Sequence, residues 1–440
     1  MRVSRFARAT LGIVTMICLS RLTAAEAASS YATLYSFKGG TDGARPYGGI
    51  TIGSGGVLYG TTFGGGMYQL GTVFKLTPVG GYWKEALVHI FTGPDGGWPS
   101  ASLVFGDNGA MFGTTETGGS GAGTIFELTP TGSPGGWDET VLYTFDSTRN
   151  SQNHTPHAEV LIGPQNALYT TSTGGCCEVG TVVALDRSST ATSVWMGNVI
   201  YSFGPYSPAG GDPLSSLILV SGAFYGTTFE AGDAACGVVG CGTVYELVPP
   251  ATTGDPWGAV AIHTFGSVVD DGGGPQASLT AGPGGVLYGT TYFGGSGGLC
   301  SYQNGNGCGT VFQLTPPEIA GKPWTETILH NFTGSNGDGA FPSGRLAVDH
   351  SGTLYGTTQY GGAGSSCSYY GAVGCGTVFK LDPPANPGEP WTEVILHNFT
   401  GQTGDGAVPI AGVTLSTDGT IYGTTSAGGF AGLGTIFKIW

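Results

Sequence analysis

The sequence LYGTT at residues 58–62, followed by a glycine-rich gap and then GTVFKL at residues 71–76, is the first clear copy of a pattern that runs along the chain. Consecutive copies are 53, 57, 56, 63, 67 and 67 residues apart. The chain is therefore a tandem repeat with loops of variable length. The aromatic residue of the first phrase marks seven copies, at Tyr59, Phe112, Tyr169, Tyr225, Tyr288, Tyr355 and Tyr422.

The composition predicts an all-β fold. The 84 glycines and 25 prolines separate short runs rich in Val, Ile, Thr, Tyr and Phe, and no amphipathic helical period appears beyond the N-terminus. A hydrophobic fraction of 40% excludes a disordered chain. The glycines have no three-residue period, which excludes collagen.

Each repeat contains four segments typical of strands. In the sixth copy we expect strands at residues 344–348, 353–358, 376–381 and 391–399, with a tight hairpin turn at residues 349–352. Four short antiparallel strands per unit are the signature of a propeller blade.

The two ends of the chain complement each other. A tryptophan precedes a strand-ending phenylalanine by eight residues in six copies, at Trp83, Trp137, Trp195, Trp257, Trp324 and Trp391. A seventh strand of this kind, residues 33–37, stands alone near the N-terminus, whereas the last repeat stops at Trp440 after its third strand. Pairing these ends removes two open sheet edges. We therefore predict a seven-bladed β-propeller of four-stranded antiparallel blades, closed by the N-terminal strand; a linear β-solenoid would not need such ends.

Residues 1–27 have the pattern of a signal peptide, with Arg2, Arg5 and Arg8, an apolar core at residues 11–19 and a small-x-small cleavage site at residues 25–27. The alternative is an uncleaved anchor, but the apolar core is well below the roughly 20 residues needed to span a bilayer. We expect one mature domain at residues 28–440, in the periplasm or outside the cell and without membrane insertion.

The charge of the mature chain disfavours two classes of partner. Residues 1–27 carry four arginines and one glutamate, so 10 basic and 28 acidic residues remain, a net charge of −18. Such a surface repels nucleic acid and anionic membranes.

Six of the eight mature cysteines form three local pairs, each bracketing a glycine-rich loop between the second and third strands of a blade. We predict the disulfides Cys236–Cys241, Cys300–Cys308 and Cys367–Cys375. A zinc site would need pairs that converge, but these belong to separate blades. The sequence allows three states for the adjacent Cys176 and Cys177: a strained vicinal disulfide, free thiols, or a disulfide to another loop.

Propeller geometry places these loops on one face, together with the loops that connect the fourth strand to the next blade. The connecting loops carry Asp-Gly-x-x-Pro in five blades, at Asp42, Asp95, Asp271, Asp338 and Asp405. These aspartates are candidates for binding a cation or sugar hydroxyls around the channel mouth. The competing interpretation is turn chemistry, in which each carboxylate caps its own backbone.

The residue just before the proline of this loop differs from blade to blade, although the sequence around it is repeated. Such a position suits recognition of an asymmetric ligand. Across the seven blades it holds Arg45, Trp98, Thr155, Asp212, Gly274, Phe341 and Val408. We take Arg45, Trp98, Asp212 and Phe341 as candidate ligand-binding residues. Trp98 and Phe341 either stack on sugars or partners, or plug the channel.

The histidines do not indicate catalysis. Four of them share one position of the fourth strand with tyrosines of other blades, which indicates a structural role; they are His89, His263, His330 and His397. His154 and His157 form a lone His-x-x-His, too weak a pattern to predict a metal site. No nucleophile elbow, phosphate loop or zinc-protease motif occurs, so we expect no cofactor. Paired carboxylates from different blades stay open.

The LYGTT phrase, the glycine loop, GTVFKL and a following Thr-Pro resemble the GloVer tandem-repeat family of exported bacterial proteins, over essentially the whole mature chain. The resemblance implies an exported repeat protein, often with an additional C-terminal anchor, and supplies no catalytic residues. This chain ends at Trp440 within a repeat strand, so we expect release rather than anchoring.

We predict a secreted, monomeric, non-catalytic binding module for a carbohydrate or for an extracellular or envelope protein. The alternative is a polysaccharide hydrolase or lyase with acidic residues in the channel. An enzyme would need two carboxylates at catalytic spacing, whereas a binder needs exposed aromatic and polar groups.

Overall fold

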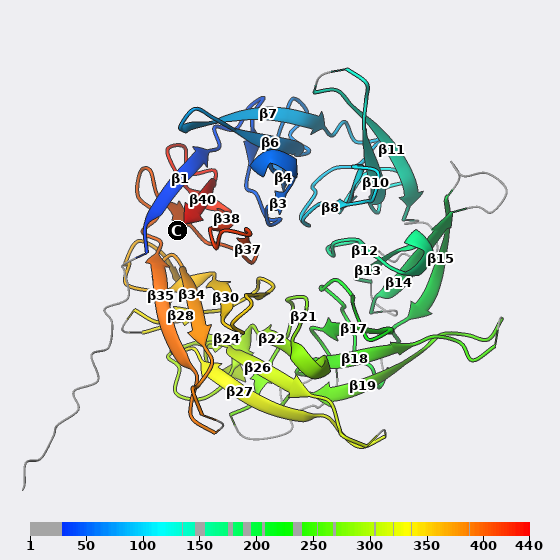
Figure 1. Ribbon diagram of the computed structural model, residues 1–440, viewed down its shortest axis with the longest axis vertical. Helices are drawn as coiled ribbons and strands as arrows, with labels where there is room; N and C mark the ends of the chain where they lie inside the picture. The colour runs from blue at the N-terminus through cyan, green and yellow to red at the C-terminus, as the bar shows by residue number, and fades with distance from the viewer. Residues whose placement is uncertain are drawn as a thin grey trace, which may run out of the picture.

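Seven four-stranded antiparallel sheets surround a central channel in the computed structural model (Figure 1). The predicted all-β, seven-bladed propeller is confirmed. The structure describes residues 29–133, 135–145, 155–174, 179–187, 195–204, 207–231, 240–252, 254–266, 270–302, 305–319, 321–335, 337–386 and 388–440. The predicted signal peptide, residues 1–27, lies outside them. Within these ranges, no helix is long and apolar enough to cross a membrane.

The first strand of each blade faces the channel and the fourth lies at the periphery. Blade 1 consists of β3 (Thr51–Ile52), β4 (Leu58–Thr62), β6 (Thr72–Val79) and β7 (Tyr82–Ile90). Blade 2 consists of β8 (Val104–Phe105), β9 (Met111–Thr115), β10 (Thr124–Pro130) and β11 (Trp137–Thr144). Blade 3 consists of β12 (Leu161–Ile162), β13 (Leu168–Ser172), β14 (Thr181–Arg187) and β15 (Trp195–Ser202).

The next three blades repeat this order. Blade 4 consists of β16 (Ile218–Val220), β17 (Ala223–Thr228), β18 (Thr243–Val248) and β19 (Gly258–Thr264). Blade 5 consists of β21 (Thr280–Ala281), β22 (Leu287–Thr291), β26 (Thr310–Thr315) and β27 (Thr325–Asn331). Blade 6 consists of β29 (Ala347–Val348), β30 (Leu354–Thr358), β34 (Thr377–Asp382) and β35 (Thr392–Asn398).

Blade 7 is built from both ends of the chain. It contains β37 (Thr414–Leu415), β38 (Ile421–Thr425) and β40 (Thr435–Ile439), and β1 (Tyr31–Ser36) supplies its outer strand. β1 pairs antiparallel with β40, from Tyr31 opposite Ile439 to Ser36 opposite Thr435. The predicted closure is therefore confirmed, and the strand edges at both ends are paired.

Short two-stranded ribbons and single 3-10 turns complete the blades. Four ribbons join a connecting loop to the end of a second strand: β2 (Gly43–Ala44) with β5 (Gly64–Gly65), β20 (Gly272–Gly273) with β23 (Phe293–Gly294), β28 (Gly339–Ala340) with β31 (Tyr360–Gly361), and β36 (Gly406–Ala407) with β39 (Ala427–Gly428). Two lie in disulfide loops: β24 (Ser301–Tyr302) with β25 (Gly305–Asn306), and β32 (Ser368–Tyr369) with β33 (Ala372–Val373). The 3-10 turns η1 (Ser54–Gly56), η2 (Pro164–Asn166) and η4 (Pro283–Gly285) join first and second strands.

The two threonines of LYGTT make different hydrogen bonds. The first donates from its hydroxyl to a backbone carbonyl of the next blade in six blades, as Thr61 does to Ala101 at 2.9 Å. The second lies 2.7–2.9 Å from the hydroxyl of the threonine that begins the third strand, with a serine in its place in blade 3. One threonine therefore ties neighbouring blades and the other ties strands within a blade.

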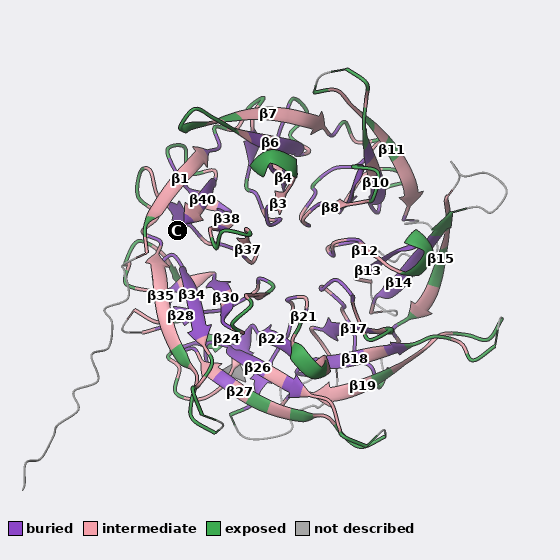
Figure 2. Ribbon diagram, viewed as in Figure 1, coloured by how far each residue is buried: buried purple, intermediate pink, exposed green. Residues whose placement is uncertain are grey.

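The glycine of LYGTT makes room for an aromatic ring on the third strand. A Cβ on Gly60 would lie 2.6 Å from Cζ of Phe74, which is too close for any side chain. Blade 3 departs from the motif in a compensated way, since Thr170 replaces the glycine and pairs with the smaller Val183. The middle strands accordingly form most of the buried core, while most residues of the peripheral strands are intermediate or exposed (Figure 2).

The fourth strand ends in a buried phenylalanine and carries a bulge just before it. In blade 1 the register shifts between Val73 and Phe74, after which Val73 pairs with His89. The same shift recurs in all seven blades. Because a bulge re-aims the side chains beside it, it turns this His or Tyr toward the following loop.

Candidate functional site

The channel encloses a cavity of about 700 Å³. Its wall comes from the residues just before the first strand of every blade and, in blades 1, 5, 6 and 7, from that strand as well; small side chains dominate the wall. Serine hydroxyls link blades here, since Ser216 Oγ accepts a hydrogen bond from the backbone of Glu159 at 2.9 Å and Ser102 Oγ accepts one from Gly49 at 2.9 Å. Burial raises the pKa of the Glu159 carboxyl, and the charge of Arg345 partly offsets this.

The varying position before the proline has one backbone frame. Arg45, Trp98, Asp212, Phe341 and Val408 all adopt left-handed φ values of 55–59°. The backbone N–H of Arg45 donates to Leu433 at 2.7 Å, and those of the other four make the equivalent bond to the preceding blade. Gly274 shares this frame, whereas Thr155 donates to Thr173 of its own blade, so the fixed frame holds in six blades and the side chains and surrounding loops differ.

A stack of three aromatic rings leads outward from the channel. Tyr47 lines the cavity, and its ring lies 4.7 Å from that of Phe63 at an angle of 25°. The ring of Trp98 lies 5.7 Å from Phe63 at 23°. Trp98 is 39% exposed, so the outer end of the stack is open to solvent. The stack joins blades 1 and 2 into one apolar surface.

Carboxylates continue this surface across the next blades. The backbone N–H of Glu116 donates to Trp98, and its carboxylate lies 2.9 Å from Nδ1 of His157, which lines the channel. Burial raises the pKa of Asp212, with His157 acting against it. Burial and the nearby Asp212 raise the pKa of Glu230. We call Tyr47, Phe63, Trp98, Glu116, His157, Asp212 and Glu230 the mouth arc.

Phe341 does not belong to an exposed surface. Although it occupies the same frame position as Trp98, it is 0% exposed and packs against Tyr292, Tyr360 and Tyr369. The ribbon inside the disulfide loop supplies Tyr369. The longer loop of blade 6 covers Phe341, which favours the packing alternative, and its contact with a ligand stays a prediction. Arg45 is exposed, as a binding residue would be.

The five aspartates lie away from the channel wall, and their binding of a cation or of sugar hydroxyls stays a prediction. None is among the residues that line the cavity. Each caps its own loop, as Asp405 does by accepting hydrogen bonds from the backbone of Thr400 and Gly406 at 2.8 Å. Turn chemistry, the competing interpretation, accounts for Asp42, Asp95, Asp271, Asp338 and Asp405.

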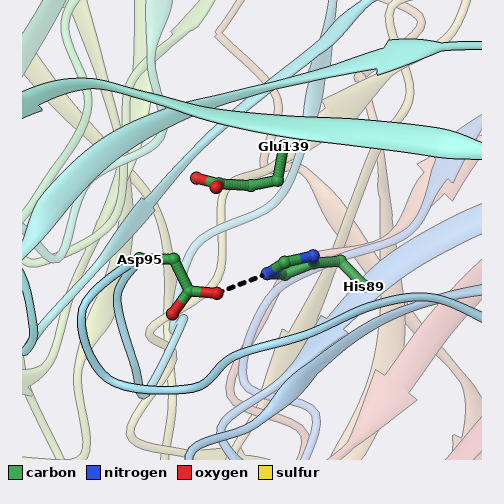
Figure 3. A group of neighbouring side chains, drawn as sticks. All are labelled: His89, Asp95 and Glu139. Atoms are coloured by element: carbon green, nitrogen blue, oxygen red, sulfur yellow. Dashed lines mark hydrogen bonds and ion pairs between the residues drawn. The ribbon is translucent and has the colours of Figure 1, made fainter.

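These aspartates also face the seams between blades. Asp95 lies 3.0 Å from Nε2 of His89, and Glu139 reaches them from the outer strand of the next blade (Figure 3). The same three residue types meet as His263, Asp271 and Glu326, and as His330, Asp338 and Glu393. The histidines and aspartates were noted in the sequence but the glutamates were missed. Their signal is a glutamate two residues after the tryptophan in four repeats.

Two predicted disulfides are confirmed, Cys300–Cys308 and Cys367–Cys375, with Cα atoms 5.1 and 4.9 Å apart. Cys241 is disulfide-bonded, and its predicted partner Cys236 lies outside the described residues. Cys176, Cys177 and His154 also lie outside them.

Solved structures resemble the chain only at low identity. An oxidoreductase of the glucose dehydrogenase type from Thermus thermophilus is 16% identical with a TM-score of 0.41, covering 77% of this chain and 95% of its own. The polysaccharide lyase Uly1 is 12% identical with a TM-score of 0.48, covering 97% and 95%. These likenesses carry no inference about activity.

The sequence comparison is more specific. No curated protein matches the chain. The profile of the Gloeobacter/Verrucomicrobia repeat matches residues 18–239 and 298–440, which is most of the sequence and includes copies of LYGTT from both ends. The chain therefore belongs to the Gloeobacter/Verrucomicrobia repeat family.

Proposed function

We propose that this protein is an extracytoplasmic, non-catalytic binding module that recognises a carbohydrate at the mouth arc. The observation that carries the proposal is the exposed end of the Tyr47–Phe63–Trp98 stack, placed directly beside the Glu116–His157 pair. Sugar rings present apolar C–H faces and polar edges, so a site for them needs a flat aromatic surface next to hydrogen-bonding groups.

The arrangement favours one class of sugar. Glu116, Asp212 and Glu230 place three carboxyl groups on the arc, and carboxylates accept hydrogen bonds from hydroxyl and ammonium groups. The raised pKa values of Asp212 and Glu230 show that a further negative charge would be unfavourable there. Neutral and amino sugars therefore suit the site better than uronic acids.

Two disulfides support an extracytoplasmic location. The disulfides Cys300–Cys308 and Cys367–Cys375 lie in the loops of this face. Disulfides of this kind persist in oxidising compartments.

A glycan array tests the proposal, with wild-type protein compared with Trp98→Ala. Tyr82→Ala is the matched control, because Tyr82 is 60% exposed and begins β7 at the turn that follows the third strand. Binding to neutral or amino glycans that Trp98→Ala loses and Tyr82→Ala keeps would support the proposal. Folded wild-type protein that binds no glycan would contradict it and favour a protein ligand.

The second candidate, a polysaccharide hydrolase or lyase, is favoured by one observation. Asp212 and Glu230 hold carboxyl groups of raised pKa, as a general acid requires, and Glu159 holds another inside the channel. Incubation of wild-type protein with any polysaccharide that it binds distinguishes the candidates. Release of reducing ends or unsaturated products that Asp212→Asn abolishes would assign catalysis, and intact polysaccharide would assign binding alone.

A further inference from the structure

Three blade seams bring the same three side chains together. The fourth strand of one blade supplies a histidine, the loop after it an aspartate, and the fourth strand of the next blade a glutamate (Figure 3). We call His89–Asp95–Glu139, His263–Asp271–Glu326 and His330–Asp338–Glu393 the seam clusters. Within each, one ligand atom per residue lies within 4.8 Å of the other two.

The spacing of these atoms is compatible with a shared metal ion, and one pair, His89 Nε2 and Asp95, lies within direct hydrogen-bonding distance at 3.0 Å. His263 Nε2 lies 3.5 Å from Glu326 Oε1, and His330 Nε2 lies 3.5 Å from Asp338 and 3.7 Å from Glu393. Zinc binds nitrogen and carboxylate oxygen at about 2.0–2.2 Å, so two ligands of a tetrahedral site lie roughly 3.3–3.6 Å apart. The seam distances fall close to this range.

Four of the cluster atoms also lack a hydrogen-bond partner. Among the described residues, the buried Oε1 atoms of Glu139, Glu326 and Glu393 have no hydrogen bond, and neither does Nε2 of His263. His263 and Glu326 side chains are each only 12% exposed. A buried polar atom without a partner is costly, and a metal ion between these atoms would satisfy them.

Charge favours a cation as the occupant. Each cluster brings two partly or fully buried carboxyl groups beside one imidazole, and a cation between the carboxyl groups would offset their mutual repulsion.

We propose that the three seam clusters are binding sites for a divalent transition metal of the zinc class. Each site has one imidazole and two carboxylate ligands from two neighbouring blades and leaves one position for water. The metal would link the outer strands of neighbouring blades at the periphery of the ring.

Two other seams serve as internal controls. At the seam of blades 7 and 1, Glu85 and Asp42 are retained but Tyr35 replaces the histidine, and its hydroxyl donates to Asp42 at 3.0 Å. Glu85 Oε1 also lacks a hydrogen bond among the described residues, so this seam differs from the clusters in its missing imidazole.

At the seam of blades 6 and 7, His397 and Asp405 are retained, but Tyr31 takes the place of the glutamate and its ring stacks 3.7 Å from that of His397. Neither control seam has the imidazole and two carboxylates together, so neither should bind metal.

The test is equilibrium dialysis of chelator-treated protein against zinc chloride, with bound zinc measured by mass spectrometry. Wild-type protein is compared with Glu326→Gln, with the triple variant Glu139→Gln/Glu326→Gln/Glu393→Gln, and with the control Glu85→Gln. Glutamine keeps the shape of glutamate and removes a buried charge, so the variants should fold. Zinc bound outside the seam clusters should be the same in wild type and in every variant, so it does not affect the difference in bound zinc between them.

We expect Glu326→Gln to bind one zinc fewer than wild type and the triple variant three fewer, with Glu85→Gln unchanged. Cobalt should give the visible absorption of a tetrahedral site in wild-type protein and lose it in the triple variant. Equal zinc in wild type and the triple variant would overturn the proposal. The clusters would then hold shared protons instead of metal.

Discussion

The indole of Trp98 lies 5.7 Å from the ring of Phe63, with 23° between their planes, although the two residues belong to different blades. Trp98 and the fully buried Phe341 share one position of the repeat and one backbone conformation. The repeat thus supplies a constant frame, and the loops determine which of its side chains reaches solvent. This is how a nearly symmetric ring acquires one asymmetric face.

The threonine that links blades should contribute measurably to stability. Thr61→Val removes the hydroxyl that donates to Ala101 in a buried site, and we expect it to lower the free energy of unfolding by about 1–2 kcal/mol. Thr290 is the matched control, because its buried hydroxyl has no hydrogen-bond partner among the described residues. Thr290→Val should be neutral or slightly stabilising in denaturant unfolding. Equal losses in both variants would contradict the assigned role.

In most blades a glycine on the second strand faces a phenylalanine on the third. Blade 3 should accept this glycine–phenylalanine pair only when both of its residues are changed together. Val183→Phe places a large ring against Thr170, so we expect about 1–3 kcal/mol of destabilisation. Thr170→Gly/Val183→Phe restores the combination seen in Gly60 and Phe74 and should recover most of the loss. A double-mutant cycle in denaturant measures the coupling, and additive effects would contradict the compensation.

Ring closure can be tested by joining the ends covalently. Ala32 pairs with Lys438, so Ala32→Cys/Lys438→Cys should form a disulfide and raise the free energy of unfolding by about 2–4 kcal/mol. Peptide mapping by mass spectrometry identifies the crosslink. Two free thiols at these positions in folded, oxidised protein would show that β1 and β40 do not pair.

The glutamate at the seam of blades 7 and 1 should make stability depend on pH. Burial, followed by the repulsion of Asp42, raises the pKa of Glu85 from 4.5 to about 7. Because the folded-state pKa lies above the unfolded value, this group favours folding below about pH 4.5 and loses that contribution as the pH rises through 7. Glu85→Gln should match wild type at pH 4 and exceed its stability at pH 8 by roughly 1 kcal/mol, given partial solvent screening. An equal difference at both pH values would contradict this assignment.

The ring could be predicted from the sequence because each residue of the repeated motif has a fixed packing partner. LYGTT specifies a buried strand, a glycine facing an aromatic ring and two threonines with fixed partners, so seven copies and two complementary ends define the architecture. Two of the disulfides followed from spacing for the same reason.

Residue-level placement of the site was less predictable, because it depends on contacts between repeats. Phe341 is covered by a ribbon whose path the repeat does not encode. The sequence alone suggested that the aspartates lie around the channel mouth. The order of residues in a loop does not show which of them face the channel and which face the seam between blades. Glu139 reaches the seam from the next blade, and only the recurrence of glutamate after the tryptophan hinted at it.

Binding of a carbohydrate at the mouth arc through Trp98 can be measured by calorimetric titration with the oligosaccharide that binds most strongly on the array. We expect Trp98→Ala to weaken binding roughly 10- to 100-fold, which corresponds to about 1.4–2.7 kcal/mol, while Tyr82→Ala leaves the affinity unchanged. Equal affinity of Trp98→Ala and wild type would contradict the account and place the site elsewhere on the propeller.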